Sequence, residues 1–465
     1  MSSSRRSSRH RGTSAALLAL IPLVLAACSE PPTGGAGPAE SDPSAEQSAE
    51  PTEVAAVSPR LLLSYDGGIQ VLDATTLEPV ADLAADGFLR LNSAGDGRHA
   101  LVSTAGGFQV LDAGTWAEPH GDHAHYYTAD AVLTDVVYPA ETPGHVIAHE
   151  GQVSLFDDGT GAVTVLDAAE IAAGPEESVQ REYTTPAAHH GVAIALEDDS
   201  LVVTDGTEEE RSGLRVLDAD DVEIAASEDC PGVHGAEVAA DGAVVAGCED
   251  GALVYRDGQI THADSPDDYG RIGNQAASEE SPIVLGDYKT DPDAELERPT
   301  QVSLIDTRTA DVTLVDLPAS YSFRSLARGD DGEALVLDTD GAIQVIDPES
   351  GELERSIPVI EAWEEPVEWQ QPRPTIAVAD GSAYVSDPNT QMIYAVDLAS
   401  GEVWNSAELS VVGNELALVS GDVENAEQAG EEQHEGDDHA GNEHEDEGEG
   451  HDHENHEHED HAHDD

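Results

Sequence analysis

Side chains that bind transition metals are concentrated in two parts of this sequence. The first is the segment after Asn425, which holds nine histidines among many carboxylates and no lysine or arginine. Neutral imidazole suits zinc, copper and nickel, and carboxylates add charge and hard ligands. We therefore expect residues 422–465 to be disordered and to bind several ions weakly, rather than to be only a solvated acidic tail. Pairs two positions apart can converge on one ion: His451, His453, His456, His458, His461 and His463.

The second part lies in the body of the chain, where three histidine segments precede stretches that we interpret as inner strands of a repeated sheet. One is a loop with three imidazoles and a carboxylate, and the others are His189-His190-Gly191 and Val233-His234-Gly235. Equivalent positions on successive repeats point at the same axial space, so His190 and His234 are expected to converge. Three or four nitrogen and oxygen ligands in a tetrahedral arrangement suit zinc. The predicted tight site comprises His123, His125, His190 and His234, with Asp122, and with His120 and His189 as neighbouring candidates.

The remaining histidines of the body are expected to have structural roles and not to bind metal. His145 and His149 flank a predicted strand and are expected to be ordinary sheet residues. His99 and His262 are expected at the surface. For the two converging histidines, structural hydrogen bonding is the alternative to metal binding.

Short strands separated by Asp/Gly turns must position these side chains, because residues 58–421 contain no convincing amphipathic helix. One unit recurs, in which apolar residues alternate with others before a turn at aspartate. A period of roughly 40 residues with about four strands is typical of a propeller blade. We therefore predict an all-β fold, a β-propeller. The unit occupies residues 68–73, 107–112, 162–167, 213–218, 301–306, 342–347 and 392–397.

The length of this body allows seven or eight blades. Seven have complete inner strands, between residue 86 and about residue 409. An eighth, beginning at Arg60, needs a missing strand from Val411 to Gly421. Such circular closure hides the sheet edges and ties the ends of a propeller together. We favour eight blades over seven.

The N-terminal segment is typical of an export signal. Arginines precede an apolar run too short to span a bilayer, and the run ends in Leu25-Ala26-Ala27-Cys28, which resembles a bacterial lipobox. We predict that residues 1–27 are a lipoprotein signal peptide and that Cys28 is lipidated; an ordinary signal peptide is the alternative. Residues 28–57 are rich in Pro, Ser, Gly, Ala and Glu, which predicts a flexible linker. The exported protein is then lipid-anchored to the outer side of the bacterial cytoplasmic membrane.

The number of cysteines predicts a disulfide, and the net charge limits the classes of molecule that the protein can bind. Of the 3 cysteines, Cys230 and Cys248 remain after lipidation, and a pair in an oxidising compartment predicts one disulfide, with metal binding as the alternative. The formal net charge is −77, with 96 acidic against 19 basic residues. This charge argues against nucleic acid and anionic membrane surfaces as partners, and we expect contact with the membrane through the lipid anchor only. We expect a monomer.

The histidine and cysteine segments give the sequence a family resemblance. The segments 120–125, 188–191 and 230–235 resemble those of the AztD family of periplasmic zinc metallochaperones, over roughly residues 58–421. The resemblance implies a β-propeller that holds zinc and transfers it by direct contact to the solute-binding protein of a zinc ABC transporter. Two departures concern the route of transfer: the histidine-rich run is C-terminal here, and the chain carries a lipobox.

We therefore expect an exported zinc metallochaperone, not an enzyme, with one tight zinc in the propeller and several weak ions in the tail. Two alternatives stay open. One is a metal-dependent propeller hydrolase or oxidoreductase, which would need an open coordination position or an organic cofactor. The other is an interaction propeller whose tail only buffers metal. No Walker motif, nucleotide-binding glycine fingerprint or GxSxG elbow supports the other common enzyme classes.

Overall fold

The computed structural model describes residues 51–121 and 123–422 of the 465-residue chain. Cys28, Asp122 and the tail histidines lie outside the described residues, so the expectations placed on them stay predictions. Among the residues that are described, no helix is both long enough and apolar enough to cross a membrane.

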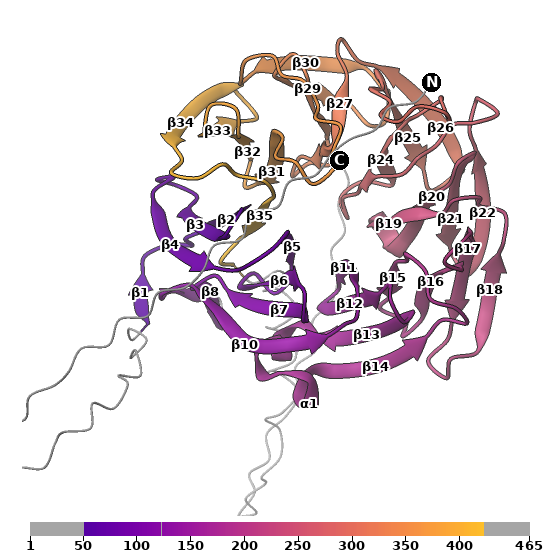
Figure 1. Ribbon diagram of the computed structural model, residues 1–465, viewed down its shortest axis with the longest axis horizontal. Coiled ribbons are helices and arrows are strands. Elements are labelled where there is room, and N and C mark those ends of the chain that lie inside the picture. Colours follow the sequence, from indigo (N-terminus) through magenta and orange to yellow (C-terminus); the bar gives the residue numbers. More distant parts are fainter. Residues whose placement is uncertain (1–50, 122, 423–465) are drawn as a thin grey trace, which may run out of the picture. The chain divides into compact units, whose positions relative to one another are not determined.

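The described residues form eight four-stranded antiparallel sheets arranged around a common centre (Figure 1). The all-β propeller class predicted from the repeats is confirmed. From the inner to the outer strand, the first four sheets are β5 (Arg90–Ser93), β6 (His99–Thr104), β7 (Gly107–Asp112) and β10 (Val132–Pro139); β11 (Pro143–His149), β12 (Gln152–Asp157), β13 (Ala162–Asp167) and β14 (Val179–Thr184); β15 (Ala193–Ala195), β16 (Leu201–Gly206), β17 (Arg211–Leu217) and β18 (Glu223–Ser227); and β19 (His234–Ala239), β20 (Ala243–Gly247), β21 (Gly251–Arg256) and β22 (Gln259–Asp264).

The remaining four sheets follow the same order. They are β23 (Gln275–Ala276), β24 (Ile283–Asp287), β25 (Gln301–Asp306) and β26 (Asp311–Asp316); β27 (Tyr321–Arg328), β28 (Ala334–Asp338), β29 (Ala342–Ile346) and β30 (Leu353–Pro358); β31 (Thr375–Ala379), β32 (Ser382–Asp387), β33 (Met392–Asp397) and β34 (Glu402–Glu408); and β35 (Leu416–Val419), β2 (Arg60–Tyr65), β3 (Gly68–Asp73) and β4 (Pro79–Ala84). Short helical turns are η1 (Ala168–Ala173), α1 (Pro175–Ser178) and η2 (Ala240–Gly242).

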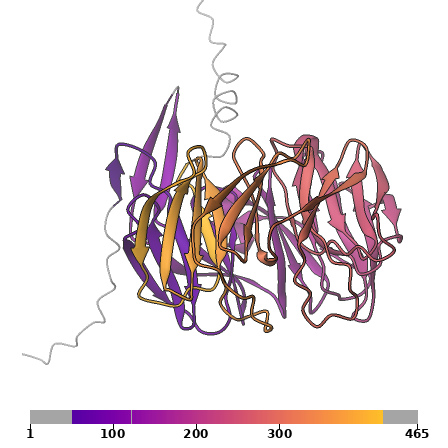
Figure 2. The same cartoon turned by 90° about the horizontal axis from the view of Figure 1, so that it is seen from above.

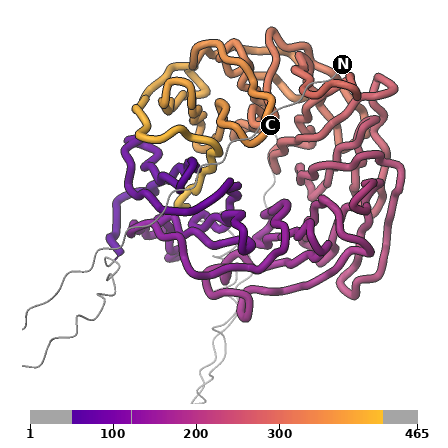
Figure 3. Tube along the Cα trace, in the orientation of Figure 1, coloured from indigo at the N-terminus to yellow at the C-terminus, as the bar shows by residue number. Residues whose placement is uncertain are grey.

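The last sheet joins the two ends of the described chain. Strand β35 supplies its inner strand and pairs antiparallel with β2, so that Arg60 lies opposite Val419 and Leu63 opposite Leu416. The Cα trace in Figure 3 shows the yellow end of the chain returning beside the indigo start. The closing strand predicted between Val411 and Gly421 is therefore present.

Aliphatic side chains between neighbouring sheets form the core. Leu62, Ile69 and Val71 of one sheet pack with Val102 and Leu111 of the next, all of them almost fully buried. Full burial of each such side chain stabilises the fold by about 1.5–3 kcal/mol. This packing explains how a chain with only 4% aromatic residues builds a large β-fold.

We call the space enclosed by the eight inner strands the channel; its two ends are defined by the beginnings and the ends of these strands. Arg90 and His145, near the beginnings of β5 and β11, line one cavity with Glu415, which precedes β35. His149, at the end of β11, lines other cavities together with residues that follow β15, β19 and β23. We call the first end the triad end and the second the acidic end.

A three-stranded ribbon is inserted into the sheet formed by β5, β6, β7 and β10. Strands β8 (Thr115–His120) and β9 (His123–Thr128) are inserted between β7 and β10, and β1 (Thr52–Val54) pairs with β9. The end of the segment expected to be a flexible linker thus forms a strand, because its backbone completes the edge of β9. Figure 2 shows this purple ribbon rising above one face of the ring.

Candidate metal centre

Three histidines from three consecutive sheets converge at the triad end of the channel. His145 lies on β11, His190 precedes β15, and His234 begins β19. The Nε2 atom of His190 is 3.3 Å from Nε2 of His145 and 3.1 Å from Nε2 of His234. The three ligand atoms all lie within 4.8 Å of one another. We call these three residues the triad.

Hydrogen bonds on the far side of two rings orient their Nε2 atoms inward. Nδ1 of His190 contacts the Asp158 carboxylate at 2.5 Å, and Nδ1 of His234 contacts the carbonyl oxygen of Gly273. Because a carbonyl only accepts, Nδ1 of His234 carries the proton in the neutral ring, which leaves a lone pair on Nε2. Such outer partners fix the tautomer and raise the basicity of metal-binding histidines.

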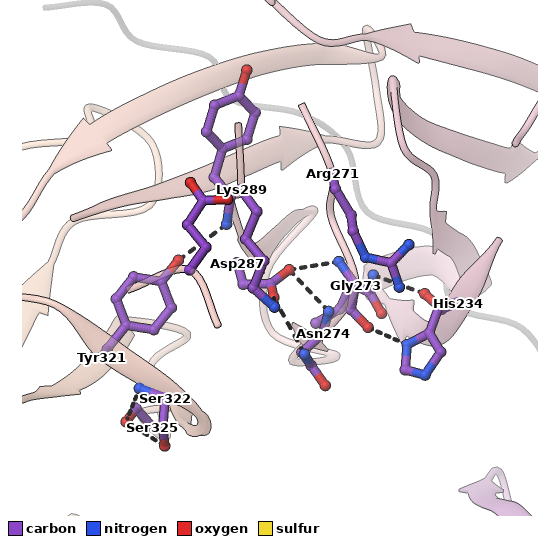
Figure 4. A network of polar contacts seen from close by, with 12 residues as sticks. His234, Arg271, Gly273, Asn274, Asp287, Lys289, Tyr321, Ser322 and Ser325 are labelled. Atoms are coloured by element: carbon purple, nitrogen blue, oxygen red, sulfur yellow. Dashed lines mark hydrogen bonds and ion pairs between the residues drawn. The ribbon is translucent and has the colours of Figure 1, made fainter. Parts of the chain in front are cut away.

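A buried carboxylate holds the loop behind His234 in place. The backbone N–H groups of Gly273 and Asn274 donate to Asp287 Oδ1, and Lys289 Nζ lies 3.1 Å from Asp287 Oδ2. Asp287 is 1% exposed. Figure 4 shows this chain of contacts from Lys289 and Asp287 through Gly273 to the His234 ring. The position of the His234 imidazole therefore depends on a polar network that extends into the next sheet.

Burial keeps two of the three rings neutral. Desolvation is the main cause that lowers the pKa of His145 well below its usual value, with the imidazoles of His234 and His190 adding to the effect. Desolvation also lowers the pKa of His234 to about 4, with the Gly273 hydrogen bond opposing it and His190 and nearby arginines reinforcing it. Since the neutral imidazole is the metal-binding form, these rings are ready to bind a cation at neutral pH.

The spacing of the triad fits a tetrahedral metal site. Zinc–nitrogen bonds of about 2.0–2.1 Å at tetrahedral angles place ligand nitrogens about 3.4 Å apart. The 3.1 and 3.3 Å separations are close to this value. Two inward lone pairs at such distances repel each other unless a cation lies between them. The chemistry of these residues therefore fits a zinc-like ion held by three imidazoles.

The triad opens into a cavity of about 370 Å³. Its lining is unusually basic for so acidic a chain, because Arg90, Arg271 and Lys289 contribute to it. Glu415 is the one carboxylate among the described lining residues, and it is held by Arg324 and by the backbone N–H of Leu91. A fourth ligand for a bound ion could therefore enter from this cavity.

The structure divides the predicted tight site between two places. His190 and His234 converge as expected, but His123 and His125 belong to a separate group with His120 on the ribbon. The ring centroids of this ribbon group are 5.1–5.6 Å apart, and His125 Nδ1 lies 2.8 Å from Glu53 Oε1. The ribbon extends away from the channel, which explains why these residues do not complete the triad.

The sequence did not indicate one member of the candidate site, His145. The expectation of an ordinary sheet residue is incomplete, because its ring lies with those of His190 and His234 in the triad. Its position near the beginning of an inner strand, where the two converging histidines of the following sheets also lie, is the signal that could have identified it. His149, given the same interpretation, contacts Glu279 at the opposite end of the same strand.

Other histidines have structural surroundings. His189 is buried, and its two ring nitrogens contact the Ala187 carbonyl oxygen and Thr204. It therefore packs behind the triad instead of joining it. His99 is 7% exposed and contacts Asp96, so its expected surface position is wrong.

The predicted disulfide between Cys230 and Cys248 is present. Cys230 lies shortly before His234, and Cys248 directly follows β20, which pairs with β19. The bond therefore fixes the segment leading to His234 against its own sheet.

Comparison with known proteins finds a zinc chaperone similar to this chain, although no family model matches the chain. The chain is 25% identical over 364 residues to the zinc chaperone AztD of Citrobacter koseri, which covers 76% of this chain and 83% of that protein. Two structures of AztD from Citrobacter koseri, one of them the apo protein, each match with a TM-score of 0.67 and 22% identity, over 78% of this chain and 98% of theirs. The dihydro-heme d1 dehydrogenase NirN matches with a TM-score of 0.50 and 13% identity, over 78% of this chain and 75% of its own. The resemblance to AztD that the histidine and cysteine segments predict is thus confirmed.

Proposed function

We propose that this protein is an extracytoplasmic zinc metallochaperone that holds one zinc ion in the triad and passes it to the solute-binding protein of a zinc ABC transporter. The observation that carries the proposal is the convergence of three Nε2 atoms from three sheets, two of them oriented by partners on Nδ1. The similarity to a zinc chaperone supports zinc as the cargo.

Three protein ligands suit transfer as well as storage. A tetrahedral ion bound by the triad has one remaining position, and the triad residues line a cavity from which a further ligand can approach. A ligand from a partner can occupy it before any triad bond breaks, so the ion changes hosts without being released to water. The basic residues in the cavity disfavour a doubly charged ion and thus favour its departure once the partner is in place.

A hydrolytic enzyme is the competing function, since catalytic zinc also has three protein ligands and an open position. Such an enzyme needs a general base near the metal-bound water. The carboxylate of Glu415 is engaged by Arg324 and by a backbone N–H, and no second carboxylate is found among the described residues of the cavity. This arrangement favours cargo over catalysis.

The surrounding features support an exported protein. The Cys230–Cys248 disulfide is typical of an oxidising compartment. Under this proposal Cys28 anchors the chain by lipid to the outer side of the cytoplasmic membrane, and the tail collects several ions weakly. The protein acts as a monomer beside its transporter.

The decisive experiment measures metal retained by the purified full-length protein after competition with a chelator, using Zn(II), Cu(II) and Ni(II) in parallel. We expect one tightly held zinc per chain that is absent from the His190→Ala/His234→Ala variant. Retention by this variant would refute the triad as the cargo site.

A second measurement addresses transfer. The zinc-loaded protein is mixed with the metal-free solute-binding protein in the presence of a chelator that traps free zinc. Zinc that reaches the binding protein without passing through the chelator supports the chaperone function. Turnover of small esters by the zinc form, without transfer, would support the enzyme instead.

A further inference from the structure

A second group of metal-binding side chains lies at the acidic end of the channel. His149 ends β11, and Glu279 follows β23, two sheets beyond the neighbouring one. His149 Nδ1 and Glu279 Oε1 are 2.9 Å apart although the residues are 130 positions apart in sequence. With Glu150 they offer three ligand atoms within 4.8 Å of one another. We call these three residues the mouth group.

The mouth group combines a buried imidazole with accessible carboxylates. The His149 side chain is 7% exposed, whereas that of Glu279 is 62% exposed. Imidazole nitrogens and carboxylate oxygens are both zinc ligands, and accessible carboxylates can exchange with water readily. All three residues of the mouth group border two cavities, of about 800 and 440 Å³, so an ion at this point is open to solvent.

The charge around the mouth group attracts cations. Its cavities contain no lysine or arginine among their described lining residues. A cleft lined by one sign of charge concentrates the opposite ion and speeds its association. The carboxylates that line these cavities are Glu150, Glu197, Asp198, Asp241, Asp257, Glu279 and Glu280.

One further carboxylate lies between the two ends. Strand β19 begins at His234 in the triad, and its last residue, Ala239, lines a cavity of the acidic end. Glu237 lies between them on this innermost strand, and no hydrogen-bond or ion-pair partner is found for it in the described part of the chain. Burial raises the pKa of Glu237 to about 7, in keeping with a carboxylate that has no cationic neighbour.

The described chain ends beside the same mouth. The N–H of Gly421 donates to the carbonyl oxygen of Gly97 at 2.8 Å, and Gly95 lines the larger cavity. Gly421 also lies close to Thr115, at the base of the ribbon. A Cβ added at Gly421 would be only 2.5 Å from Thr115 Oγ1. The described chain therefore ends near the mouth group, at the end of β35 that is farther from the triad, and the histidine-rich sequence follows this point.

From this placement we infer that His149, Glu279 and Glu150 form a second, weaker divalent-cation site through which ions enter the channel, pass Glu237 and reach the triad from the acidic end. This inference rests on the proposed function, since it assigns a loading route to the same cargo site. The tail and the ribbon supply ions at one face, and the partner removes them at the other.

Location is tested with crystals of the full-length protein equilibrated with two equivalents of zinc, by anomalous diffraction at the zinc edge. Besides any zinc held by the ribbon histidines, we expect one peak within the triad and a weaker peak between His149 and Glu279. Only the peak between His149 and Glu279 should be lost in His149→Ala and in Glu279→Gln. A peak at the triad alone would overturn the second site. A peak at the mouth group alone would refute the proposed function and leave the second site standing.

The loading role is tested by the rate at which the metal-free full-length protein removes zinc from a coloured chelator complex. We expect Glu237→Gln/Glu279→Gln to load about tenfold more slowly, as expected when focusing charge is lost, with the final tight stoichiometry unchanged. The rates are measured well above pH 7, where Glu237 is ionised, so that the control Glu402→Gln/Glu408→Gln on the outer strand β34 makes the same change in net charge. Equal rates in the two double variants would overturn the route.

Discussion

The two ends of the channel offer opposite environments for the same kind of ion. At the triad end, three imidazoles lie among arginine and lysine side chains, and burial holds two of the rings neutral. At the acidic end, a single imidazole lies among carboxylates. Ligand geometry therefore favours tight binding at one end, and electrostatic attraction favours rapid capture at the other. The ligands that hold an ion tightly and the negative charges that attract it therefore lie at different ends of the same channel.

The largest expected effect is loss of the tight site on removal of two triad imidazoles. Structural zinc sites contribute about 10–16 kcal/mol through about four ligands, so losing two should weaken binding by at least about 1,000-fold. His190→Ala/His234→Ala should show this loss in chelator competition, while His123→Ala/His125→Ala should retain the tight ion. Equal losses in both variants would remove the distinction between the triad and the ribbon group.

The next effect concerns the support behind the rings. Asp158→Asn removes the charge that contacts His190 Nδ1, and Asp287→Asn weakens the network that fixes the Gly273 carbonyl. Outer partners of this kind are worth about 10–100-fold in metal affinity. Affinity measured by competition should fall in this range, with unchanged stoichiometry. Thermal unfolding of the metal-free variants serves as the control for folding.

A third prediction uses pH to separate the two kinds of site. An unperturbed imidazole is protonated below about pH 6.5, and protonation competes with metal. Burial depresses the pKa of His234 to about 4 and that of His145 well below its usual value, so protons compete with metal at these rings only in more acidic solution. Weakly held ions should therefore leave first as the pH falls, and the triad ion should leave nearer pH 4. One common release step in a zinc titration against pH would contradict this.

The smallest expected effect comes from the basic side chains of the triad cavity. Arg271 contributes to the lowered pKa of His234 and should disfavour a zinc ion for the same electrostatic reason. Arg271→Gln should therefore bind zinc several-fold more tightly and transfer it to the partner more slowly. Arg308→Gln, which removes a cation that is paired with Asp306 and Glu349 on the outer side, is the control. Weaker binding in Arg271→Gln would show that the arginine supports the site through its contacts.

Most of the fold could be predicted from local sequence patterns. The alternation in residues 68–73 and its later copies specified strands, and the Asp/Gly turns specified their spacing, because both depend on neighbouring residues. The partial strand after Val411 also indicated closure with the strand at Arg60. The strand at Thr52–Val54 could not be predicted, since its backbone is stabilised by pairing with β9 and not by its own composition.

The candidate site was predicted in part. His190 and His234 follow from equivalent positions in successive repeats, whereas His145 lacks the glycine that follows each of the other two. The grouping of His123 with His120 depends on a ribbon insertion whose direction no sequence pattern encodes. The contact of His149 with Glu279 joins sheets that are not adjacent, so only the closed ring brings it about.

The pairing of β35 with β2 has a consequence for proteolysis. A cut just after residue 422 would release the histidine-rich segment but preserve every hydrogen bond between these two strands. A cut before Leu416 would instead remove the inner strand of the last sheet and break the circular join. Under the proposed function, trimming by a protease at this point would remove the weak tail sites and leave the triad and its sheets intact.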